Sequence, residues 1–318
     1  MATRVTMRLR IVFFGTPAFA VPTLAALLAS PHDVVAVVTQ PDRPRGRGQR
    51  VSDAPVKALA VERGVRVLQP IRLSRELFET EFAGLGADLG VVAAYGKILP
   101  EWLLQTPRLG LINVHASLLP TYRGAAPIQR AVMNGEPETG VTIMRIVKAL
   151  DAGPMMAKAV RPIGPTDTSE EVERDLATIG ADLLVGVLDP LAAGTLIEAP
   201  QDEALATYAP RLTKEEGLID FTRPAVAVHN QIRGLRPWPA AYTHLNGARL
   251  VVHRARVSTR QSPAPAGTCL MADAAGITVA CGDGGAVDFL DVQPDGRRIM
   301  TARDYLAGHG TVAGQRFG

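Results

Sequence analysis

The chain has 318 residues, of which 47% are hydrophobic and 20% are charged, and its formal net charge is +3. This is the composition of an ordinary soluble globular protein, and the length suffices for one large core and a second, smaller one. No apolar run approaches the roughly 20 residues of a membrane-spanning helix, and the first residues lack the pattern of a secretion signal. These features argue against a membrane-spanning or secreted protein, and we expect a cytoplasmic one.

From residue 10 to residue 189, after a short extension at 1–9, apolar strand-like runs alternate with helix-like stretches. Strands are expected at 10–15, 33–39, 65–68, 88–93, 110–115, 139–147 and 155–162. Helices are expected at 17–29, 54–63, 74–83, 126–134 and 168–188. This alternation predicts a doubly wound, mostly parallel α/β sheet with helices on both faces, in which ligands bind at the carboxyl ends of the strands.

The first turn of this domain indicates whether the sheet binds a dinucleotide, which is a frequent ligand of doubly wound sheets. Its fingerprint is Gly-x-Gly-x-x-Gly, whereas residues 15–20 read Gly-Thr-Pro-Ala-Phe-Ala. Thr39 and Gln40 follow the second strand, where an acidic residue would bind the ribose. The sequence therefore argues against a nucleotide-dependent oxidoreductase.

A basic loop follows the second strand. It contains no acidic residue, two glycines and four arginines, which are Arg43, Arg45, Arg47 and Arg50. Like charges on a tight loop repel one another unless an anion binds there. We expect this loop to contact phosphates.

Asn113 and His115 lie two residues apart at the end of an expected strand, so their side chains point to the same face. Asp151 follows the next expected strand, on a loop that also contains Gly153 and Pro154. One amide, one imidazole and one carboxylate suit a site that polarises a carbonyl group and moves a proton, without a covalent enzyme intermediate. Taken alone, the Asn-x-His segment is also typical of a capped strand end, and Asp151 of a turn.

Residues 190–210 contain spaced prolines and small residues and are expected to form a linker. Beyond it, at 211–318, a helix is expected near 224–234. Five short strands are expected at 240–244, 249–257, 267–271, 276–281 and 286–292. They suggest a small OB-like β-barrel. This region carries 13 Lys+Arg against 9 Asp+Glu, a net charge of 13 − 9 = +4, and Cys269 and Cys281 within it show no disulfide or zinc pattern and are expected to be buried thiols.

Several strings resemble the folate-dependent formyltransferases over nearly the whole chain. Residues 112–120 read Ile-Asn-Val-His-Ala-Ser-Leu-Leu-Pro, and 150–153 read Leu-Asp-Ala-Gly. Residues 122–130, Tyr-Arg-Gly-Ala-Ala-Pro-Ile-Gln-Arg, and 138–144, Glu-Thr-Gly-Val-Thr-Ile-Met, are similar to the members that formylate methionyl-tRNA. Three positions depart from the pattern: Ala18, Thr121 and Ala149. Thr121 stands where a basic residue is usual, which removes an expected phosphate contact.

The resemblance implies formyl transfer from 10-formyltetrahydrofolate to the α-amino group of the initiator methionyl-tRNA, without a metal. It implies that Asn113 and His115 stabilise the oxyanion and that Asp151 accepts the proton of the amine. It also implies a backbone cradle for the folate, made by Ser117, Leu118, Leu119, Pro120, Tyr95 and Gly96. We further expect the basic loop and the domain at 211–318 to bind tRNA. No obligate protein partner is implied.

Two kinds of alternative stay open at this level. One is a folate-dependent formyltransferase that acts on a sugar nucleotide or another small amine, or a module that hydrolyses formyl-folate. The other is a non-catalytic RNA-binding relative. Product analysis separates them, because only the first interpretation puts labelled formate on methionyl-tRNA.

Overall fold

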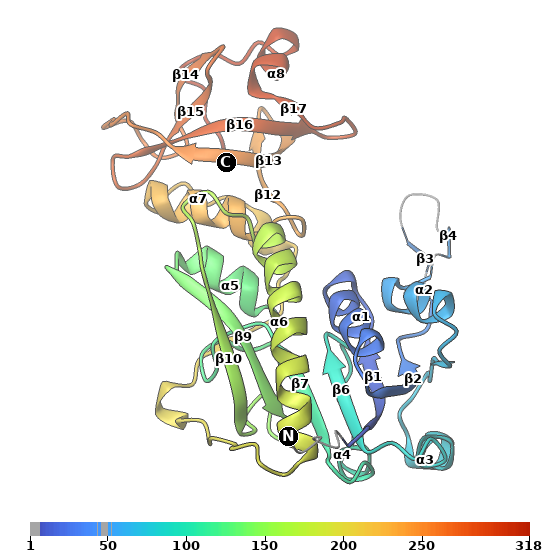
Figure 1. The fold of residues 1–318 in the computed structure, drawn as a ribbon. Helices are drawn as coiled ribbons and strands as arrows, with labels where there is room; N and C mark the ends of the chain where they lie inside the picture. The colour runs from blue at the N-terminus through green and yellow to red at the C-terminus, as the bar shows by residue number, and fades with distance from the viewer. Residues whose placement is uncertain (1–6, 43, 46–49, 52) are drawn as a thin grey trace. The chain divides into compact units, whose positions relative to one another are not determined.

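The computed structural model describes residues 7–318 apart from 43, 46–49 and 52 (Figure 1). The chain folds into two compact units. Unit 1 comprises Met1–Gly124, Thr139–Arg161 and Glu173–Tyr208, and unit 2 comprises Ala125–Glu138, Pro162–Val172 and Ala209–Gly318. Two short segments from the middle of the sequence thus belong to the same unit as the last 110 residues (318 − 209 + 1).

Unit 1 is built, in its described residues, on a seven-stranded sheet. The strands, in spatial order, are β10 (Met155–Pro162), β9 (Glu138–Arg145), β7 (Leu111–His115), β6 (Leu89–Ala93), β1 (Arg10–Gly15), β2 (Asp33–Val38) and β5 (Val67–Leu68). The five strands from β7 to β5 pair in parallel, and β9 pairs with β7 in antiparallel fashion. The predicted doubly wound, mostly parallel sheet is therefore confirmed.

Helices connect these strands and cover the sheet. They are α1 (Val21–Ala29), α2 (Pro55–Glu62), α3 (Arg75–Ala83), α4 (Glu101–Gln105) and α6 (Ser169–Ala192). On one face, Phe78 and Phe82 of α3 pack with Phe14 and Tyr95 in a core cluster from which water is excluded. Continuous burial along β1 and β6 fits strands that are covered on both faces.

The order of the strands creates a switch point beside β1. The chain runs outward from β1 through β2 to β5, then returns to place β6 on the other side of β1. Successive connections therefore diverge at the carboxyl ends of β1 and β6, which is where ligands bind in sheets of this kind.

Unit 2 contains an antiparallel sheet in spatial order β12-β13-β16-β15-β14, with β17 paired to β16. Its elements are α5 (Pro127–Asn134), α7 (Ala225–Gly234), β12 (Ala241–Leu245), β13 (Ala248–Val257), β14 (Cys269–Asp273), β15 (Gly276–Ala280), β16 (Ala286–Pro294), β17 (Met300–Thr301) and α8 (Ala302–Gly308). The last residues join the two edge strands, because Gly318 donates a hydrogen bond to His244 and Cys269 donates one to Gln315. The five predicted strands all form, and the OB-like topology stays a prediction.

Some elements differ from the expectation. Helix α6 continues to Ala192, since Pro190 lies in its last turn and does not end it. Residues 190–210 also contain a 3-10 turn at Glu203–Leu205 and strand β11 (Tyr208–Ala209), which pairs with β8 (Arg123–Gly124). Helix α8 was not predicted, although Thr301 caps it through the Asp304 N–H, a signal that the sequence does carry. The domain limits predicted at 10–189, 190–210 and 211–318 remain a prediction.

Candidate active site

Strand β7 presents the predicted Asn–His pair on one face of the sheet. Val114 points to the other face, towards α6, where a Cβ atom on Gly180 would come within 2.7 Å of it. Asn113 and His115 therefore share the opposite face, as the strand periodicity predicts. His115 is 5% exposed, whereas Asn113 is partly exposed and its side-chain amide has no hydrogen-bond partner within the described part of the chain. The Asn113 amide is available to a ligand.

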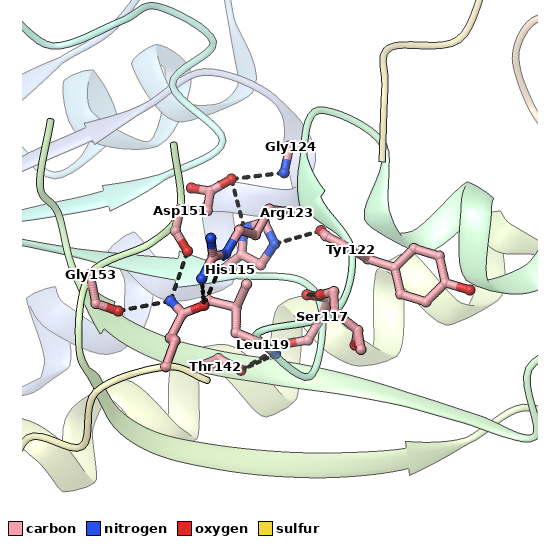
Figure 2. A network of polar contacts seen from close by, with 11 residues as sticks. His115, Ser117, Leu119, Tyr122, Arg123, Gly124, Thr142, Asp151 and Gly153 are labelled. Atoms are coloured by element: carbon pink, nitrogen blue, oxygen red, sulfur yellow. Dashed lines mark hydrogen bonds and ion pairs between the residues drawn. The ribbon is translucent and has the colours of Figure 1, made fainter. Parts of the chain in front are cut away.

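His115 meets Asp151 and the backbone of the 120–124 loop (Figure 2). Its Nε2 lies 3.1 Å from the Tyr122 carbonyl oxygen, and its Nδ1 lies 3.7 Å from Oδ2 of Asp151. A carbonyl oxygen only accepts, so Nε2 carries a proton. The nitrogen left to exchange a proton is Nδ1, which faces the carboxylate.

The Asp151 carboxylate is held from a second direction by the Gly124 N–H, which donates to Oδ2 over 2.9 Å. The backbone of Asp151 is left-handed, with φ of 46°, and that of Tyr122 is too, with φ of 60°. Each such conformation costs on the order of 1 kcal/mol and persists only where neighbouring contacts enforce it. The structure thus holds both loops in one conformation around His115.

The segment predicted to cradle the folate is a tight loop after β7. Ser117 Oγ donates to the Thr121 carbonyl over 2.6 Å, and Thr121 Oγ1 donates to the Leu118 carbonyl over 2.6 Å. Thr142 on β9 anchors the loop to the neighbouring strand, because its Oγ1 donates to the Ser117 carbonyl and accepts from the Leu119 N–H. Thr121, which stands where a basic residue is usual, therefore stabilises the turn itself.

Leu119 also accepts a hydrogen bond from the ammonium group of Lys158 on β10. Partial burial lowers the pKa of Lys158. Pro120 completes this loop, and its carbonyl accepts from the Thr207 N–H over 3.3 Å. Leu118, Leu119 and Pro120 thus lie on one ordered turn directly after His115.

Tyr95 and Gly96 lie elsewhere, at the switch point beyond β6. The Tyr95 side chain is 2% exposed and its hydroxyl has no hydrogen-bond partner in the described structure, so its ring belongs to the core. Burial raises the pKa of this phenol to about 12. Its carbonyl accepts from Gln40 Nε2 over 2.8 Å. Gly96 has φ of 78°, and a Cβ atom there would come within 2.7 Å of Gln40. Backbone, and not the ring, is what these two residues present at the strand ends.

Three polar residues of the site were not predicted: Thr142, Arg123 and Gln201. Thr142 lies opposite His115 in the antiparallel pairing of β7 and β9, so its role depends on strand register. Arg123 lies within the motif at 122–130, but the sequence alone indicates no role for it. Gln201 lies in the expected linker, where the sequence carries no signal for it.

The basic loop forms a short hairpin, with β3 (Pro44–Arg45) paired to β4 (Arg50–Val51). Arg43 and Arg47 lie outside the described residues. A clasp joins the two ends of the hairpin, because Lys57 Nζ lies 2.5 Å from Asp42 and 2.8 Å from Asp53. The clasp lowers the pKa of Asp42 through its hydrogen bond to Lys57.

The described residues lack two features that would bear on function. They contain no cluster of three or more His, Cys, Asp or Glu side chains arranged to bind a metal ion. No helix among them has the length and apolar character needed to cross a membrane. Cys269 and Cys281 are free and buried, as predicted.

Comparison with known families defines the class of the protein. Residues 8–188 match the family described as formyl transferase, and residues 211–310 match the formyl transferase C-terminal domain. The solved N-formyltransferase from Helicobacter canadensis, in complex with folinic acid and dTDP-3-aminofucose, has a similar fold, with a TM-score of 0.68 at 18% identity. The match covers 90% of this chain and 99% of that one.

Curated relatives narrow the class. The methionyl-tRNA formyltransferase of Ectopseudomonas mendocina is 54% identical over 276 residues, 87% of each chain. That of Acidobacterium capsulatum is 46% identical over 311 residues, 98% of this chain and 100% of the relative. The chain belongs to the family of methionyl-tRNA formyltransferases.

Proposed function

We propose that this protein transfers the formyl group of 10-formyltetrahydrofolate to the α-amino group of the initiator methionyl-tRNA. Its kinship with the methionyl-tRNA formyltransferases supports both substrates. The observation that carries the proposal is the approach of Asp151 Oδ2 to within 3.7 Å of Nδ1 of His115, at the end of the strand that also presents the Asn113 amide, which has no hydrogen-bond partner among the described residues. We also propose a cytoplasmic location, because both substrates belong to protein synthesis.

The reaction forms a C–N bond between the α-amine and the formyl carbon, and breaks the bond from that carbon to N10 of the folate. The tetrahedral intermediate carries an oxyanion and a protonated amine. Asn113 donates its N–H to the oxyanion; one such donor typically contributes roughly 3 to 4 kcal/mol. Asp151 accepts the proton of the amine. His115 was expected as a second oxyanion donor, but its two ring nitrogens face the Tyr122 carbonyl and the Asp151 carboxylate. We therefore assign it the exchange of the proton between its Nδ1 and that carboxylate, and a proton then returns to N10 of the leaving folate.

The residues present fit a folate co-substrate. Its flat pterin ring and its amide groups need a close-fitting surface that is already held in place before the ligand binds. The turn at 117–120 is such a surface, because internal hydrogen bonds to its carbonyl groups hold it in place, and the exposed backbone of Gly96 lies at the neighbouring strand end. We assign the cradle to this turn and to the backbone of Tyr95 and Gly96.

The tRNA is assigned to the basic parts of the chain. We propose that residues 10–189 carry the chemistry, that 190–210 connect, and that 211–318 contact the tRNA. Arg43, Arg45, Arg47 and Arg50 would grip the phosphates of the acceptor end. The excess of positive charge at 211–318 supports this assignment, since phosphate contacts dominate the affinity for nucleic acids.

The test supplies the purified chain with 10-formyltetrahydrofolate labelled in the formyl group, together with charged initiator tRNA. We expect labelled N-formylmethionine after hydrolysis of the aminoacyl ester. Parallel reactions contain an amino sugar nucleotide, or no acceptor. Formylation of the sugar nucleotide but not of methionyl-tRNA, or release of labelled formate without an acceptor, would contradict the proposal.

A further inference from the structure

Residues 199–208 of the expected linker pass directly over the loops that carry the proposed catalytic groups. Ala199 bridges Met155, just after the Asp151 loop. Thr207 accepts from the Tyr122 N–H through its hydroxyl and from the Arg123 N–H through its carbonyl, each over 2.8 Å. This segment therefore contacts both loops around His115.

Gln201 is the residue of this segment that reaches the Asp151 loop. Its Nε2 donates to the carbonyl of Asp151 over 2.7 Å and to that of Gly153 over 2.8 Å. A Cβ atom at Gly153 would come within 1.9 Å of the Arg145 carbonyl, so the loop is packed tightly on its other side. The two N–H groups of one amide thus hold a turn whose first residue has a left-handed backbone.

The other end of the Gln201 amide is fixed by a buried arginine. Oε1 of Gln201 accepts from Nε and Nη2 of Arg123, over 3.0 and 2.8 Å. The Arg123 guanidinium also pairs with Glu203, and its side chain is 2% exposed. Because Arg123 only donates, it fixes which end of the Gln201 amide is oxygen, and hence directs the N–H groups to Asp151 and Gly153.

We infer that Gln201, oriented by Arg123, is a positioning residue that sets the direction of the Asp151 carboxylate. The inference rests on the proposed role of Asp151 as proton acceptor. No hydrogen bond from Gln201 reaches the carboxylate itself, so Gln201 acts through the backbone of the loop. The carboxylate itself accepts a hydrogen bond from the N–H of Gly124, which follows Arg123 in the chain.

Gln201→Glu is the sharpest test. A glutamate retains the acceptor oxygens for Arg123 but has no N–H for the two carbonyls, and its second oxygen repels them. We expect kcat to fall by about 10²-fold, the cost of a misplaced catalytic group. We expect unchanged KM values for folate donor and tRNA, and at most a small fall in melting temperature. Gln105→Glu, the same substitution at an exposed residue at the end of α4, is the control and should be fully active.

A double-mutant cycle separates positioning from independent effects. In an Asp151→Asn background, Gln201→Glu should cause no further loss. The inference would be overturned if the losses of kcat in the two single variants multiplied in the double variant, or if Gln201→Glu were fully active. A fall in melting temperature together with raised KM values would also overturn it. Should Gln201→Glu not fold, Gln201→Met, which has a similar length and no N–H, takes its place in the cycle. An inactive Asp151→Asn with a fully active Gln201→Glu would leave the proposed function standing, whereas an active Asp151→Asn would contradict the proposed function itself.

Discussion

Asn113 offers the most direct experimental test of the chemistry of the site. Its amide makes no hydrogen bond within the described structure, so removing it leaves no other group unpaired. We expect Asn113→Ala to lower kcat by about 10²- to 10³-fold, the usual loss of one oxyanion donor. The measurement is single-turnover formylation with saturating donor. The thermal unfolding curve should match that of the unchanged chain, and a near-normal rate would remove Asn113 from the mechanism.

For Tyr95, in contrast to Asn113, we expect that removing the side-chain polar group does not lower activity. Its buried hydroxyl has no partner in the described structure, and a buried unsatisfied polar group typically costs about 1–3 kcal/mol. We expect Tyr95→Phe to leave stability unchanged or to raise it, and to leave formylation intact, since only the backbone of Tyr95 faces the strand ends. Loss of folate binding in this variant would contradict the assignment of the ring to the core.

The pH dependence of stability gives Tyr95 a second readout. Burial raises its pKa to about 12, above the ordinary value of 10.0. Below pH 10 the phenol is protonated in both the folded and the unfolded chain, so it contributes no pH dependence. Between pH 10 and about 12 the unfolded chain ionises first, and stability falls. Tyr95→Phe should weaken this fall, as measured by denaturant unfolding at several pH values.

Among the elements, the β3–β4 hairpin is the one whose role depends on a ligand. The backbone register pairs Arg45 with Arg50, so two of the four arginines of the basic loop belong to the ladder itself. The Asp42–Lys57–Asp53 clasp fixes the two ends of the hairpin. An arginine-rich element that is anchored at its base is suited to bind a polyanion.

We therefore expect the double variant Arg45→Ala/Arg50→Ala to weaken tRNA binding and to flatten its salt dependence. Each lost phosphate contact should reduce the log–log slope by about 0.7 to 0.9. Binding of a folate analogue should not change. Arg63→Ala, an exposed arginine at the end of α2, is the matched control. An unchanged slope in the double variant would show that these two arginines do not contact the tRNA.

At the scale of the whole molecule, the two units interleave in the sequence. Residues 162–172 belong to unit 2, where Arg233 donates to the carbonyls of Gly164 and Asp167 and Ser169 donates to that of Gly234. Residues 199–208 belong to unit 1, where they hold the loops of the site. Neither unit is therefore complete in a fragment that ends near the end of α6.

We expect a fragment of residues 1–194 to lose formylation and to bind a folate analogue more weakly than the intact chain, because it lacks Gln201 and Thr207. A fragment of residues 1–210 retains both and should bind the analogue better than the shorter one. Fluorescence titration and near-ultraviolet circular dichroism measure these differences. Equal binding by 1–194 and the intact chain would contradict the dependence of the site on residues 199–208.

The sequence by itself determined those features that depend on local periodicity and on strings of neighbouring residues. The alternation of strands and helices predicted the parallel sheet. The two-residue spacing of Asn113 and His115 placed both on one face of β7, because side chains alternate along any strand.

The tertiary structure decided what depends on contacts between distant residues. The approach of Asp151 to His115, the pairing of Thr142 with the loop at 117–119, and the chain from Arg123 through Gln201 to Asp151 join residues 23 to 78 positions apart. Residues 190–210 contain prolines and polar side chains and were therefore expected to form a linker. No local sequence pattern indicates which carbonyl groups the side-chain amides of such a segment contact in the folded chain. The direction of a hydrogen bond over such a separation is set only when the packed chain fixes both of its ends.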